Sequence, residues 1–153
     1  MIKTINHKIL VIHGPNMNLI GLKTAGDGKR ITLDKLNRYL RKTAKKIGLS
    51  LTIIQTNEEG RAVSHLQSQR KKIKGILLFP GPWKQSGYVI KDTLEILAIP
   101  CIIASLGKNT EILKGIKCVD EESIYISVEK ALTWLAQQIQ LATKDLLRKV
   151  GPN

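Results

Sequence analysis

Short apolar runs that end in polar loops recur along the chain. The first, at residues 8–12, stops at His13 and the turn-forming segment that follows it. Similar runs occupy residues 49–56, 75–79 and 100–105, and a shorter one occupies residues 117–119. Runs without a polar face are typical of strands that are buried on both sides, as in a parallel sheet.

Helical periodicity separates these runs. At residues 32–47 apolar side chains recur at spacings of three and four, with Thr32 placed as an N-cap and Gly48 placed to end the helix. Residues 62–72 and 88–97 predict two further helices, and residues 121–149 predict a long C-terminal helix or two helices separated near Gln140.

Strand and helix therefore alternate about five times along residues 1–153. The pattern predicts a single α/β domain of the flavodoxin-like class, with a doubly wound five-stranded parallel sheet and helices on both faces. In such sheets ligands bind beyond the carboxyl ends of the strands. The loops at residues 13–30, 57–60, 80–87 and 105–110 are therefore the candidate site.

The composition, with 42% hydrophobic and 24% charged residues, is that of a globular protein. No run reaches the roughly 18 apolar residues of a membrane span, and the N-terminus lacks the apolar stretch of a secretory signal. We therefore expect the protein in the cytoplasm or an organelle interior rather than secreted. Cys101 and Cys118 lie in apolar stretches and are expected to be buried, reduced thiols.

The charge is strongly basic, with 25 Lys and Arg against 12 Asp and Glu, a net +13. Such a charge favours polyanionic partners, RNA among them, but no nucleic-acid motif accompanies it, so a solvated basic surface tuned for solubility or an acidic neighbour is the preferred interpretation. His13 is expected to stabilise its loop by donating to backbone, and Trp83 to pack on its own loop or at a subunit interface.

Several loop motifs resemble those of one enzyme family, the type II 3-dehydroquinate dehydratases. The segment GPNMNLIG at residues 14–21 resembles the family's GPNLNLLG, and QTNEEG at residues 55–60 resembles its QSNHEG. The FPG loop at residues 79–81 resembles NPG, Asp92 lies in KDTL where the family has RDAL, and Ile99-Pro100 resembles the IPV strand start. The spacing agrees over residues 8–107.

The resemblance implies a mechanism without metal, Schiff base or cofactor. A tyrosine base, poised by an arginine, removes a proton beside the ketone of 3-dehydroquinate, and a histidine acid then protonates the departing hydroxyl of the enolate. By this resemblance Asn16 retains the position that holds a water near the enolate oxygen, and Lys23 stands at the arginine position. Gly28 stands where the tyrosine base would be and Ser105 where the histidine acid would be, so both proton-transfer groups are lost.

The positions that would contact substrate are also altered. Phe79 replaces an asparagine, Gln85 replaces a histidine, and Gly107 replaces a serine in the loop whose backbone would hold the carboxylate. The resemblance places these candidate substrate-binding residues: Asn57, Glu59, Phe79, Gln85, Asp92, Leu106 and Gly107. Asp92 occupies a position that reaches a neighbouring subunit in the family.

Three functions remain open. The first is a catalytically inactive or repurposed homologue that serves as a homo-oligomeric scaffold or binding subunit, since the family builds trimers that associate into dodecamers. The second is an impaired or divergent dehydratase, or another small-molecule lyase, that uses Asn16, Lys23, Asn57 and Glu59. The third is RNA binding by the cations of residues 38–46 and 70–74.

Overall fold

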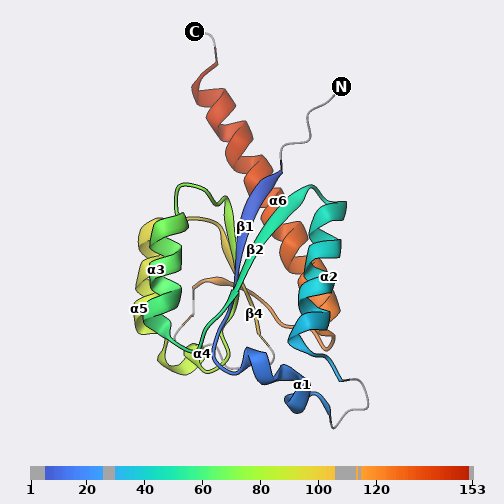
Figure 1. The fold of residues 1–153 in the computed structure, drawn as a ribbon. Helices are drawn as coiled ribbons and strands as arrows, with labels where there is room; N and C mark the ends of the chain where they lie inside the picture. Colours follow the sequence, from blue (N-terminus) through green and yellow to red (C-terminus); the bar gives the residue numbers. More distant parts are fainter. Residues whose placement is uncertain (1–5, 26–29, 106–112, 114, 152–153) are drawn as a thin grey trace.

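The computed structural model of the 153-residue chain describes residues 6–25, 30–105, 113 and 115–151. A five-stranded parallel sheet with the order β2-β1-β3-β4-β5 forms its centre (Figure 1). The strands are β1 (His7–His13), β2 (Leu49–Gln55), β3 (Gly75–Phe79), β4 (Cys101–Ala104) and β5 (Lys117–Val119). The flavodoxin-like, doubly wound parallel sheet predicted from the apolar runs is therefore confirmed.

Alternate residues of the central strands enter two separate cores. Ile9 and Val11 of β1 pack under α2 (Leu33–Lys46) and α6 (Ile124–Lys149) on one face of the sheet. Leu10 and Ile12 pack under α3 (Glu59–Gln69) and α5 (Tyr88–Leu97) on the other face. Helices cover both faces, so these strands have no polar side, as their sequences predicted (Figure 1).

Helix α2 forms as its sequence predicts. The Thr32 hydroxyl accepts a hydrogen bond from the backbone N–H of Lys35 at 3.2 Å, which satisfies one of the donors that a helix start leaves unpaired. Leu36, Leu40 and Ala44 are buried against the sheet. Helix α3 begins at Glu59 and ends at Gln69, three residues earlier than expected at each end. It ends there because the backbone turns, and the N–H groups of Lys72 and Ile73 donate to the Gln69 carbonyl.

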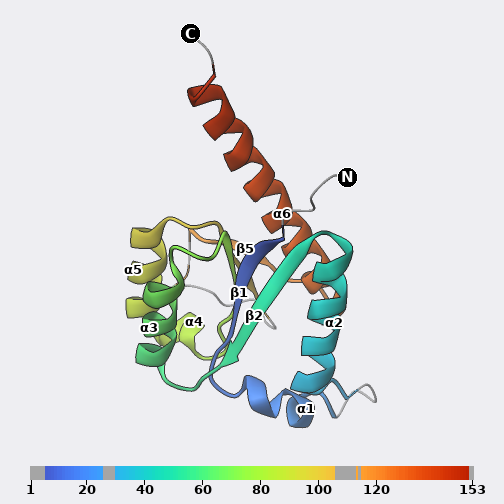
Figure 2. The same ribbon diagram turned by 45° about the horizontal axis from the view of Figure 1, so that its top comes forward.

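Helix α6 is continuous over 26 residues, so the break considered near Gln140 is absent. Residues 124–139 of the helix bury Val128, Leu135 and Ile139 against the sheet, whereas residues 140–150 are exposed and project from the body (Figures 1 and 2). At about 1.5 Å per residue the helix is about 39 Å long, longer than the roughly 23 Å of a seven-residue strand. The sheet ends before the helix does.

The edges of the sheet differ from its centre. Strand β5 is an edge strand in which Lys117 and Cys118 are exposed, so the prediction that both thiols are buried is wrong for Cys118 and right for Cys101.

Within the described part of the chain, no helix is both long enough and apolar enough to cross a membrane.

Candidate ligand pocket at the carboxyl ends of the strands

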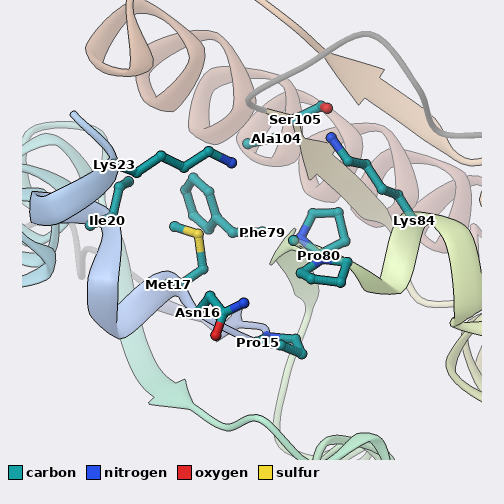
Figure 3. A pocket seen from close by; sticks show the side chains of 12 residues that line it. Pro15, Asn16, Met17, Ile20, Lys23, Phe79, Pro80, Lys84, Ala104 and Ser105 are labelled. Atoms are coloured by element: carbon teal, nitrogen blue, oxygen red, sulfur yellow. The ribbon is translucent and has the colours of Figure 1, made fainter. Parts of the chain in front are cut away.

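A cavity of about 340 Å³ opens where β1, β3 and β4 end (Figure 3). Its walls come from the loop after β1, from the loop after β3 and from the last residues of β4. The described lining residues are Pro15, Asn16, Met17, Ile20, Lys23, Phe79, Pro80, Gly81, Pro82, Lys84, Ala104 and Ser105. The pocket therefore lies at the edge of the sheet where parallel α/β folds bind ligands.

Asn57 fixes the loop that carries Asn16. Asn16 has a left-handed backbone with a φ of 68°, which asparagine tolerates better than most residues. Its backbone N–H donates to Oδ1 of Asn57 at 3.2 Å, and Nε2 of Gln55 donates to the same oxygen at 3.1 Å. Asn57 thus supports the pocket without lining it.

Two glycines let the loops after β1 and β3 approach each other closely. A Cβ at Gly14 would lie 2.5 Å from the carbonyl oxygen of Pro80, and one at Gly81 would lie 2.6 Å from that of Pro15. Gly81 also has a φ of +55°, which favours glycine. The N–H of Gly14 donates to the carbonyl of Phe79 at 2.8 Å. The two loops therefore form one close-packed wall.

Phe79 lines the pocket and rests on His13. The two rings stack with centroids 4.8 Å apart and an interplanar angle of 25°. Nε2 of His13 lies 2.8 Å from Oδ1 of Asn37 on α2, and no described group pairs with the buried Nδ1. Burial lowers the pKa of His13 to about 4, against the opposing effect of the Asn37 hydrogen bond. His13 is therefore neutral at physiological pH, and it bonds a side chain rather than the backbone acceptor expected.

Two lysines supply the charge of the pocket. Lys23 ends the short helix α1 (Ile20–Lys23), and Lys84 lies on the one-turn helix α4 (Trp83–Ser86). Figure 3 shows both side chains extending from opposite sides toward the same space. No carboxylate is present among the described lining residues, and no ion pair between described residues includes either lysine.

The structure brings together part of the predicted site. Asn16, Lys23, Phe79 and Ser105 line the cavity. Glu59 starts α3 away from the cavity, and one of its carboxylate oxygens is buried without a described partner. Gln85 and Asp92 are exposed and do not line the cavity, and the positions Gly28, Leu106 and Gly107 lie outside the described residues.

Sequence reasoning missed Lys84, Met17 and Ile20 as lining residues. On α4, Trp83 is buried in the core, so the neighbouring Lys84 and Gln85 point in different directions. Lys84 is the one that faces the pocket. The loop position after a buried strand was the available signal, but it did not identify which side chain of the turn enters the cavity.

The described walls carry two ammonium groups, one amide and one hydroxyl among apolar side chains. Lysine ammonium groups and the amide nitrogen of asparagine donate hydrogen bonds to anionic oxygens. The described lining includes no tyrosine, histidine or carboxylate that could serve as the usual base or acid. The arrangement is therefore suited to holding a small anion.

Comparison with known proteins agrees with the motifs. The family model described as Dehydroquinase class II matches residues 7–110. Similar curated proteins include the 3-dehydroquinate dehydratase of Trichodesmium erythraeum, 38% identical over 99 residues that cover 65% of this chain and 66% of that protein. Another is the 3-dehydroquinate dehydratase of Roseiflexus castenholzii, 37% identical over 100 residues that cover 65% of this chain and 64% of that one. The chain thus spans slightly less than two thirds of the length of these relatives.

Solved structures show the same fold. The type II dehydroquinase from Propionibacterium acnes superposes with a TM-score of 0.75 at 22% identity, covering 87% of this chain and 98% of that one. The type II dehydroquinase from Butyrivibrio crossotus gives a TM-score of 0.72 at 22% identity, covering 84% and 98%. Taken with the family match over residues 7–110, these observations show that the chain belongs to the class II dehydroquinase family.

Proposed function

We propose that this protein is a non-catalytic member of the dehydroquinase family that binds a small anionic molecule. One observation carries the proposal: the pocket remains open around Asn16 and Lys23, while its described walls contain no proton-transfer side chain of the usual kind. In this proposal the protein keeps the fold and the cavity of the family but lacks the acid and base side chains that the family's reaction requires.

Ser105 illustrates the loss. It lies at the end of β4, at the position where the family resemblance implies a histidine acid, and it lines the cavity. A serine hydroxyl does not titrate near neutral pH and is a poor proton donor. Loss of a general acid or base typically lowers the rate by about 10²–10⁴-fold. Because Gly28 also occupies the tyrosine position, dehydration would lack a side chain for each of its two proton transfers.

The proposal includes self-assembly. Asp92 is exposed on α5, and Val89 and Ile96 lie three residues before it and four after it, on the same side of the helix, with 56% and 72% of their surfaces exposed. Neighbouring exposed apolar side chains are typical of protein interfaces. Because the family resemblance implies subunit contact at Asp92, we propose that this face of α5 joins copies of the chain into a homo-oligomeric binding subunit.

A divergent enzyme is the second candidate, favoured by the retained Asn16 and by relatives that are 3-dehydroquinate dehydratases. Steady-state kinetics with 3-dehydroquinate decides between the two. We expect kcat/KM at least about 10³-fold below that of the Trichodesmium erythraeum relative assayed in parallel. Turnover comparable to that relative would overturn the non-catalytic proposal and favour the enzyme.

A further inference from the structure

Lys84 adds a second cation to a pocket where the family resemblance accounts for one. Lys23 stands at the position that the resemblance assigns to an arginine, whereas no motif assigns a charge to Lys84. The two side chains come from different loops, after β1 and after β3, and approach the cavity from opposite sides (Figure 3). A ligand between them would be held from two directions.

The local structure holds Lys84 in place. Trp83, the residue before it, is 4% exposed and packs in the core under α3 and α5. The carbonyl of Trp83 accepts a 2.7 Å hydrogen bond from the N–H of Gly87, which closes the turn of α4. A Cβ at Gly87 would lie 2.6 Å from the Trp83 carbonyl oxygen, so the turn is tightly closed. An anchored turn therefore presents Lys84, which is itself half-buried.

The charge of Lys84 acts on the nearby thiol of Cys118. Burial and the charge of Asp120 raise the pKa of Cys118, while the positive charge of Lys84 lowers it. Lys84 and Ser105 line the same pocket, and Figure 3 shows the Lys84 side chain extending toward the side of the pocket where Ser105 lies. Lys84 does not form an ion pair with any described carboxylate.

The two lysine charges lie across a small cavity, and no ion pair between described residues neutralises either of them. Met17, Ile20 and Phe79 form apolar walls that reduce the screening by water. Because the described lining contains two ammonium groups and no carboxylate, it favours an anionic ligand. A ligand with one negative charge would neutralise one of the two lysine charges, and a ligand with two negative charges would neutralise both.

The size of the cavity limits the ligand. Its volume of about 340 Å³ lies at the lower end of the range for small-molecule sites. A metabolite of similar size fits, and a nucleic-acid strand does not.

We propose that the pocket binds a small dianion, either a phosphate ester or a dicarboxylate, with Lys23 and Lys84 on opposite sides of its negative charge. This inference rests on the proposed anion-binding function and adds the ligand class. Lys84 acts in it as the residue that selects a doubly charged ligand over a singly charged one.

Isothermal titration calorimetry at pH 7.5 and constant ionic strength tests the proposal with four probes that carry no, one or two negative charges. Glycerol is neutral, glycerate carries one charge, and succinate and glycerol 3-phosphate carry two at this pH. We expect both dianions, or one of them, to bind at least about tenfold more tightly than glycerate. Succinate alone would identify a dicarboxylate site, and glycerol 3-phosphate alone would identify a phosphate site.

Three variants complete the test. Lys84→Gln should weaken dianion binding about tenfold while changing glycerate binding by less than about threefold, and Lys84→Arg should retain most of the dianion affinity. Lys42→Gln, which removes the same charge from the exposed side of α2, should have little effect. Equal affinity for glycerate and the dianions, or equal losses in Lys84→Gln and Lys42→Gln, would overturn this inference and leave the non-catalytic proposal in place. Ordinary turnover of 3-dehydroquinate would overturn that proposal instead.

Discussion

His13 and Phe79 stack with ring centroids 4.8 Å apart, so one wall of the ligand pocket rests on a buried, neutral imidazole. The contact links acidity to the integrity of the site, because protonation of His13 would place an unpaired charge directly behind Phe79. Nδ1 is the atom that would take the proton, and no described acceptor faces it.

Acid should therefore destabilise the protein through His13. The pKa of His13 in the folded protein, about 4, lies below the ordinary histidine value of 6.5, so the unfolded chain binds a proton first, and stability is lost as the pH falls from about 6.5 to about 4. The loss from this group amounts to at most about 3 kcal/mol. Urea denaturation across this range measures it. His13→Gln should remove most of the slope, and His65→Gln should not; an unchanged slope in His13→Gln would refute the assignment.

Gly81→Ala should open the wall between the two loops. The added Cβ would lie 2.6 Å from the Pro15 carbonyl oxygen on a backbone with a φ of +55°, so we expect a loss of about 2 kcal/mol or more in the free energy of unfolding. The matched control is Gly60→Ala in α3, where nothing lies within 4 Å of the added atom. That change should stabilise slightly. Similar effects of the two substitutions would contradict the close packing.

Restoring the two missing proton-transfer groups should not restore the enzyme. The double variant Gly28→Tyr and Ser105→His supplies a base and an acid by residue type, yet Phe79 remains fixed against His13 and Gln85 remains outside the pocket. An acid and a base accelerate the reaction little when the substrate is not held in the correct position. We expect kcat/KM for 3-dehydroquinate to rise by less than about tenfold. Activity at the level of the curated relatives would show that the remaining pocket suffices.

The net charge of +13 should produce RNA binding that is weak and dominated by salt. Each neutralised phosphate releases counterions, so binding of a single-stranded RNA seen near 50 mM salt should be lost by about 200 mM. The triple variant Arg38→Glu, Lys42→Glu and Lys45→Glu tests the exposed side of α2. Arg41 is left intact because its guanidinium donates to the Leu51 carbonyl at 3.1 Å. Binding that survives 200 mM salt would favour a nucleic-acid function.

The sequence predicted the central strands and α2 closely, because buried parallel strands are continuous apolar runs and the cap at Thr32 is a local signal. It did not predict which residue of α4 faces the pocket, because that depends on where Trp83 packs in the folded core. Cys118 was misplaced for a similar reason: its strand is the last in the sheet, where Lys117 and Cys118 are exposed although Val119 is buried. These features depend on tertiary arrangement rather than on local pattern.

The exposed end of α6, residues 140–150, depends on the packed part of the helix for its helical order. Residues 140–150 make a segment of about three turns, shorter than the roughly 12–15 residues that an isolated helix needs to persist in water. Its order must propagate from the packed residues up to Ile139, which act as a preformed nucleus. Amide protons should therefore exchange progressively faster along the outer turns, and the helical content of this segment should fall with temperature well before the sheet unfolds.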